Sequence, residues 1–121
     1  MSTLEVSNLN DGTTTVATTF VTNGSAKTWC QWSGASVIRD SLNVSSIADI
    51  ATGSNTLTYT TNFANDDYAG GGLARENSSG GAAFMRLSTF SSSNTRYFCV
   101  DESATSTDGE TQMAVLHGDL A

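Results

Sequence analysis

The chain has 121 residues, of which 38% are hydrophobic and only 14% are charged. Five basic against twelve acidic residues give a formal net charge of −7, which disfavours nucleic-acid partners because phosphates would be repelled. No stretch approaches the roughly 18 apolar residues of a membrane helix, so we expect no membrane insertion. No signal peptide opens the chain, so we expect the protein to be assembled in a cytoplasm. The length suits one domain. Abundant Ser, Thr and Asn with few strong helix formers predict an all-β fold.

The chain is expected to begin with an amino-terminal arm or short strand over residues 1–10. Leu4, Val6 and Leu9 in this segment do not keep the strict alternation of a long strand. Asn10-Asp11-Gly12 is typical of a turn. A single antiparallel domain is then expected over residues 11–121.

The segment from Thr13 to Trp32 predicts a hairpin, because Asn23-Gly24 is a common two-residue turn. Trp29 and Trp32 lie an odd number of residues apart, so they point to opposite faces of their strand. We expect Trp32 in the core. Two interpretations of Trp29 remain: it lies under the amino-terminal arm, or it lies at a subunit interface, where tryptophan is enriched. In this hairpin, one face would hold Val16, Thr18, Phe20, Lys27, Trp29 and Gln31.

Further short strands follow along the chain. The last of them should place Met113 and Val115 on one face and Ala114 and Leu116 on the other. Gly70-Gly71-Gly72 would permit a bulge or the close approach of another backbone. Eight to ten short strands at this spacing predict a β-sandwich or jelly roll. The expected strands after the hairpin cover residues 36–40, 42–47, 56–63, 82–87, 96–100 and 111–117.

No catalytic, cofactor or metal site is expected. Cys30 and Cys99 are interpreted as two buried thiols, with a disulfide between strands as the alternative. Together with the single His117 they lack the paired spacing of a metal site. Two acidic loops offer carboxylates that could converge in a groove, as in glycosidases, or bind calcium, but their spacing favours solvated loops. Those loops carry Asn65, Asp66, Asp67, Asp101, Glu102, Asp108 and Glu110.

Two segments of the chain are distinctive, Gly-Ser-Ala-Lys-x-Trp at 24–29 and Ile-Arg-Asp-Ser-x-Asn-Val-Ser-Ser-Ile at 38–47. Chiefly through them, the chain resembles small tail-fibre-like structural proteins of marine tailed bacteriophages. The resemblance covers most of residues 11–121. Weaker parts of it are the strand ending at Phe63, the following Tyr68 and the closing His117-Gly118-Asp119.

The resemblance implies a virion surface protein: a β-sandwich, commonly a homotrimer, without catalytic activity or a cofactor. Its partners would be its own copies, other phage structural proteins and a host surface glycan or protein. One hypothesis is a tail-fibre or receptor-binding tip, and Tyr68 would then stack on a sugar. The alternative is a capsid decoration protein that docks through residues 1–10, and a third hypothesis is a polysaccharide-cleaving enzyme. The expected subunit or docking interface is Leu4, Val6, Leu9, Phe20 and Trp29; the expected receptor-facing residues are Asp66, Asp67, Tyr68, Asp101, Glu102, Asp108 and Glu110.

Overall fold

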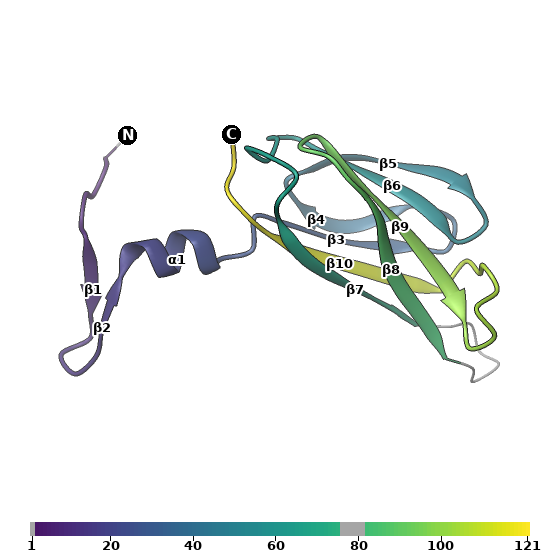
Figure 1. Cartoon of the computed structure of the whole chain (residues 1–121), viewed down its shortest axis with the longest axis horizontal. Coiled ribbons are helices and arrows are strands. Elements are labelled where there is room, and N and C mark those ends of the chain that lie inside the picture. The colour runs from purple at the N-terminus through teal and green to yellow at the C-terminus, as the bar shows by residue number, and fades with distance from the viewer. Residues whose placement is uncertain (1, 76–81) are drawn as a thin grey trace.

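The computed structural model describes residues 2–75 and 82–121, so Met1 of the expected arm lies outside the described residues. Within these ranges the chain forms ten strands and one helix, and all strand pairings are antiparallel. The expected antiparallel all-β class is therefore confirmed. Figure 1 shows two parts, a two-sheet domain formed by β3 to β10 and an arm formed by β1, β2 and α1.

The two-sheet domain contains two four-stranded sheets. The first sheet has the strand order β4-β3-β10-β7 and the second has the order β5-β6-β9-β8. Both sheets combine hairpin neighbours with strands that are distant in sequence. The first sheet consists of β3 (Thr28–Ser33), β4 (Ile38–Leu42), β7 (Ala69–Arg75) and β10 (Thr111–His117). The second consists of β5 (Val44–Ala51), β6 (Ser54–Tyr59), β8 (Ala83–Phe90) and β9 (Asn94–Asp101).

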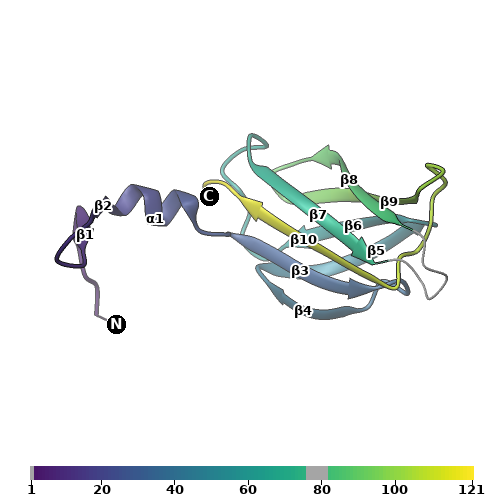
Figure 2. The same ribbon diagram turned by 90° about the horizontal axis from the view of Figure 1, so that it is seen from below.

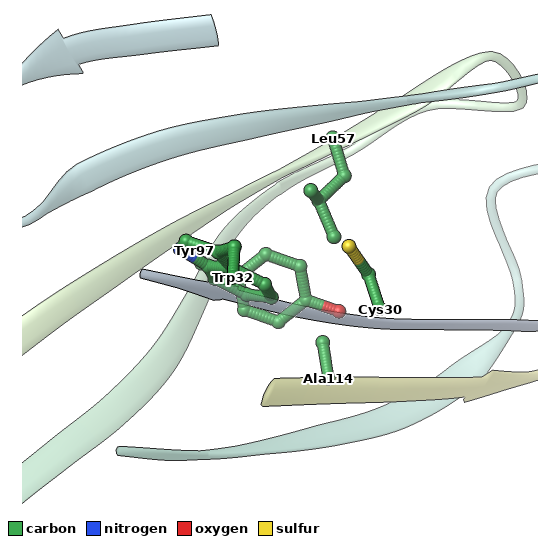
Figure 3. Packing of buried hydrophobic residues seen from close by; sticks show 5 residues of the cluster. All are labelled: Cys30, Trp32, Leu57, Tyr97 and Ala114. Carbon is green, nitrogen blue, oxygen red and sulfur yellow. The ribbon is translucent and has the colours of Figure 1, made fainter. Parts of the chain in front are cut away.

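The main core lies between the two sheets. Period-two alternation in β3 buries Thr28, Cys30 and Trp32 and leaves the residues between them half-buried. Trp32 is fully buried and its ring centroid lies 5.8 Å from that of Tyr97 in β9. The expected core position of Trp32 is therefore confirmed. Figure 3 shows this cluster, which comprises Cys30, Trp32 and Ala114 from the first sheet and Leu57 and Tyr97 from the second.

The strands place the connections at two opposite ends of the domain. The proximal end carries the loop over residues 60–68, the chain terminus after β10 and the point where the arm leaves. The distal end carries the β3–β4 turn, the β5–β6 turn and the loop over residues 102–110. The seven residues of β10 join the two ends and span roughly 24 Å at the usual rise of a strand.

Asn43 carries the chain from the first sheet to the second at the proximal end. Its φ of 59° lies in the left-handed region, which asparagine tolerates better than most residues. Its side-chain amide donates to Thr28 Oγ1 at 3.1 Å and to the Thr61 carbonyl at 3.0 Å, and its Oδ1 accepts from the Thr61 N–H at 2.7 Å. The expected strand over 56–63 accordingly ends at Tyr59, because residues 60 and 61 bond to Asn43 instead of to a strand.

The hairpin predicted around Asn23-Gly24 is wrong, because this segment belongs to the arm and is helical. Residues Asn8–Asn10 (β1) pair with Thr15–Ala17 (β2), across the turn that was expected at Asn10-Asp11-Gly12. The chain then forms helix α1 over Thr18–Gly24, so Asn23-Gly24 ends a helix. The arm therefore extends to Gly24, beyond the expected boundary between residues 10 and 11.

Local hydrogen bonds stabilise α1 in spite of its β-branched residues. Thr18 Oγ1 donates to the carbonyls of Val6 at 3.0 Å and Ser7 at 3.1 Å, which ties the start of α1 to the segment before β1. Thr22 Oγ1 donates to the carbonyls of Thr18 and Thr19 within the helix. Lys27 Nζ donates to the Thr22 carbonyl, so a cation lies at the carbonyl end of the helix, where it is favourable.

Candidate functional site

The arm presents apolar side chains that the two-sheet domain leaves uncovered. Leu4 is 82% exposed and Phe20 is 75% exposed, and α1 contains no buried residue. Figures 1 and 2 show the arm extending from the proximal end in both views. The arm thus brings four of the five expected interface residues onto one projecting segment: Leu4, Val6, Leu9 and Phe20.

Trp29, the fifth expected interface residue, lies on the outer face of the first sheet. The interpretation that placed it under the amino-terminal arm is wrong, because the arm extends away from this sheet (Figure 2). Trp29 is directly opposite Val115 in β10 on one side and Leu42 in β4 on the other. It is half-buried by these neighbours, while Trp32 points inward.

Trp29 borders a groove of about 540 Å³ on this outer face. The groove runs between β3, β10 and β7. Val115 and Met113 form its middle, and Leu73, 70% exposed, forms its far side. None of the described residues that line it is charged. The side chains that face the groove belong to Trp29, Gln31, Leu73, Met113 and Val115.

Gly71 creates part of this hollow. It lies directly across from Val115, and a Cβ built on it would have no heavy atom within 4 Å. Its neighbours in β7 differ, since a Cβ on Gly70 would lie 2.7 Å from the Val115 carbonyl oxygen and one on Gly72 would lie 3.1 Å from the Met113 carbonyl oxygen. The expected close approach at the triple glycine is therefore confirmed for the inward positions, whereas Gly71 opens the outer surface.

The structure excludes Tyr68 as a receptor-facing side chain. Tyr68 is 7% exposed, and its ring stacks on that of Phe63 with centroids 4.4 Å apart. Its hydroxyl donates to the Ser91 carbonyl at 3.1 Å and contacts Thr95 Oγ1. Tyr68 therefore fixes the proximal loop to the core and cannot stack on a sugar.

The acidic loops lie at opposite ends of the two-sheet domain. Asp66 and Asp67 are exposed in the proximal loop, on the side where the arm leaves. The other four acids lie at the distal end, at the far side of β10. The structure therefore does not bring the two loops together into one receptor-facing surface. The distal four are Asp101, Glu102, Asp108 and Glu110.

Three of the distal acids have structural contacts. Asp101 Oδ1 accepts from the N–H groups of Ser103 and Thr105, both at 2.9 Å, and so shapes the turn after β9. Asp108 Oδ1 accepts from the Gly53 N–H at 2.6 Å, which ties this loop to the β5–β6 turn. Glu110 forms an exposed ion pair with Arg75 at 3.4 Å. Glu102 is exposed on the outside of the loop.

The cysteines and the histidine have structural surroundings. Cys30 and Cys99 are both buried between the sheets, and burial raises the pKa of the Cys30 thiol to about 11. His117 Nδ1 lies 3.0 Å from the Gly24 carbonyl oxygen and so contacts the end of α1. Among residues 2–75 and 82–121, no group of three or more His, Cys, Asp or Glu side chains is placed to hold a metal ion.

In the described part of the chain, no helix has the length and apolar character needed to cross a membrane.

The groove was not predicted from the sequence as a site. Its signal was present in β10, where apolar residues occupy both faces, so that Met113 and Val115 had to lie on an apolar outer surface.

Comparisons of the chain with protein-family models, with curated proteins and with solved structures found no match.

Proposed function

We propose that the chain is a non-enzymatic structural protein on the surface of a bacteriophage particle, as a tail-fibre or receptor-binding tip component. The two-sheet domain is assigned to the β-sandwich or jelly-roll-like class, and the assembled unit is a homotrimer bound to other phage structural proteins. The sequence resemblance suggests the particle. The observation that carries the assembly role is the projecting arm, whose apolar side chains its own domain does not cover.

An uncovered apolar arm is unfavourable in an isolated protein and favourable in an assembly. Burial of apolar surface contributes roughly 25 cal/mol per Å². Exposed apolar patches on soluble proteins mark interaction surfaces more often than chance would give. The groove beside Trp29 is a second such patch on the same chain. The presence of two uncovered apolar surfaces on one small chain supports the proposal that other protein subunits bind to it and cover them.

The layout gives the protein an attached end and an outward end. The arm and the proximal loop lie at one end, so docking occurs there. The loop over residues 102–110 lies at the distal end and faces the host surface. Glu102, Asp108 and Glu110 are exposed acids of this loop, whereas Asp66, Asp67 and Tyr68 lie at the attached end and are not part of the host-facing surface.

A capsid decoration protein is the second candidate. The feature that favours it is the length of the arm, which includes the expected docking segment and continues through a helix. A decoration protein needs such an extension to reach neighbouring capsid subunits. In that role, substitutions in the distal loop would leave the host range unchanged.

Copy number and location on purified virions test the proposal. We expect few copies per particle and antibody label at the tail tip in electron micrographs. Many copies distributed over the head would replace the tail role by the decoration role. Absence of the chain from purified virions, measured by quantitative mass spectrometry, would refute both.

A further inference from the structure

The outer face of the first sheet is an apolar surface that no other described part of the chain covers. Trp29, Val115 and Gly71 lie side by side across β3, β10 and β7, and Gln31, Met113 and Leu73 form the next row. Gly71 leaves a hollow between larger apolar side chains. A protein segment with a protruding apolar side chain is the kind of ligand that such a groove accepts.

Helix α1 is a donor surface on the same chain. Residues three and four apart share one side of a helix, so Phe20 and Val21 lie with Gly24 along one face. Phe20 and Val21 are exposed, and the small Gly24 at the end of this face leaves room for close contact. Thr18–Gly24 contains no charged residue, and the groove lining contains none among residues 2–75 and 82–121.

The absence of charge on both surfaces matters because the whole chain carries a net charge of −7. Two copies therefore repel each other over most of their surfaces. Contact between copies is least opposed where an uncharged segment meets an uncharged groove. The exposed Phe20 and the groove beside Trp29 provide such a pair of surfaces.

The arm of one copy does not cover its own groove. Lys27 N–H donates to the Leu116 carbonyl at 2.9 Å, and Gly24 contacts His117, so the exit of the arm is held at the proximal end. Lys27 Nζ also bonds to the end of α1. From this exit α1 runs away from the first sheet, as both views show (Figures 1 and 2).

We propose that α1 of one copy, with Phe20 foremost, occupies the groove beside Trp29 of a second copy. Each copy then gives one arm and accepts one arm. Such a head-to-tail contact closes into a ring when its rotation allows and otherwise extends as a filament. It deepens the self-association included in the proposed function, but it depends only on this chain, so it can be tested in solution without the particle.

Two matched variants of the full chain test the contact. Gly71→Trp puts a large side chain into the groove, and its Cβ is accommodated because an ideal Cβ at this position meets nothing within 4 Å. Phe20→Ser removes the donor side chain from a helix that has no buried residue. Val37→Ser is the control, since Val37 is an exposed apolar residue at the distal end, outside both surfaces. Circular dichroism and thermal unfolding establish that each variant keeps its fold.

Analytical ultracentrifugation over a range of about 1 to 100 µM protein should show self-association of the unaltered chain. For each test variant, the dissociation constant of this self-association should be higher by ~10-fold or more. Val37→Ser should leave it unchanged. A mixture of Gly71→Trp, which keeps its arm, with Phe20→Ser, which keeps its groove, should form a one-to-one heterodimer.

Three results would overturn the proposal. The unaltered chain could stay monomeric up to the highest concentration. Phe20→Ser could associate as well as the unaltered chain, which would indicate contact between two sheet faces. The mixture could contain only monomers, although each variant is folded. None of these results bears on whether the chain is found on virions, so a failure here leaves the proposed particle role to its own test.

Discussion

The hydroxyl of Tyr59 donates to the hydroxyl of Tyr68 at 3.0 Å inside the proximal end of the domain. Both hydroxyls also contact Thr95 Oγ1, and Tyr68 reaches the Ser91 carbonyl. This buried network joins β6, β9 and the loop over residues 60–68. The loop is therefore held by polar contacts in addition to the stacking of Tyr68 on Phe63.

Tyr68→Phe should lower the free energy of unfolding by about 1–3 kcal/mol, because it leaves buried hydrogen-bonding groups without their partner. Urea unfolding followed by circular dichroism measures the change. Tyr97→Phe is the matched control, since the buried Tyr97 hydroxyl has no hydrogen-bond partner among the described residues. Its removal should be neutral or stabilising. Equal losses for the two variants would contradict the network.

Gly53→Ala and Gly71→Ala should differ strongly in stability. Gly53 has a φ of 69°, and a Cβ there would lie 2.4 Å from the Cys99 carbonyl oxygen. Strain and collision together should cost ~2 kcal/mol or more, whereas Gly71→Ala should be neutral or slightly stabilising because the site is open and the strand favours a side chain. Thermal unfolding midpoints measured at a concentration where the chain is monomeric compare the two. A smaller effect at Gly53 than at Gly71 would contradict the geometry of the β5–β6 turn.

The folded domain should lose stability in alkaline solution. Burial raises the pKa of Cys30 to about 11 and raises the pKa values of Tyr59 and Tyr97 above their ordinary range. Unfolding releases these groups to ordinary pKa values of 9.0 and 10.0, so above about pH 9 the unfolded chain binds fewer protons than the folded chain. The stabilisation is complete below that pH and is lost as the pH rises, by up to ~1.4 kcal/mol per pH unit for each proton.

Urea unfolding at a series of pH values tests this dependence. Tyr97→Phe should make the alkaline decline less steep, because one of the titrating groups is removed. A free energy of unfolding that stays constant between neutral pH and pH 10 would show that these groups are not buried.

Removal of residues 1–24 should leave the two-sheet domain folded. Residues 2–24 of the arm contain no buried residue, and their described links to the domain are the contacts around Gly24, Lys27 and His117. At submicromolar concentration, the shortened chain should unfold within ~0.5 kcal/mol of the full chain. A loss of cooperative unfolding on heating would show that the arm is part of the folding unit.

The sequence was informative where alternation is local. The opposite orientations of Trp29 and Trp32, and the two faces of the last strand, follow from the period of a strand and are confirmed. The turn at Asn10-Asp11-Gly12 also follows from local chemistry, because Asp11 Oδ1 accepts from the N–H groups of Thr13 and Thr14.

The hairpin prediction failed because Asn23-Gly24 fits two structures. Asparagine and glycine tolerate the backbone of a hairpin turn, but glycine is also typical of a helix end. The contacts of Thr18 with Val6 and Ser7, more than ten residues earlier, favour the helix. The residue propensities of the segment did not indicate a helix, because threonine favours strands and these contacts are with residues distant in sequence.

Tyr68 was misplaced for a similar reason. It follows the polar run Asn65-Asp66-Asp67 and therefore resembled a surface residue. Its burial depends on Phe63 and on Phe90, 22 positions further along the chain, whose ring centroid lies 5.3 Å away. The groove depends likewise on the register that sets Gly71 beside Val115. Partners chosen by register between distant strands cannot be read from one strand alone.

The opposite positions of the arm and the distal loop make the chain modular. Within the described residues, Phe20 in α1 lies at one end and Glu102 after β9 lies at the other, with the strands of the two-sheet domain between them. A foreign peptide grafted into the loop after Glu102 would thus be displayed away from the arm, with the residues of the arm unchanged. In the proposed role, the distal loop could then accept new sequence while the segment proposed to dock stays the same.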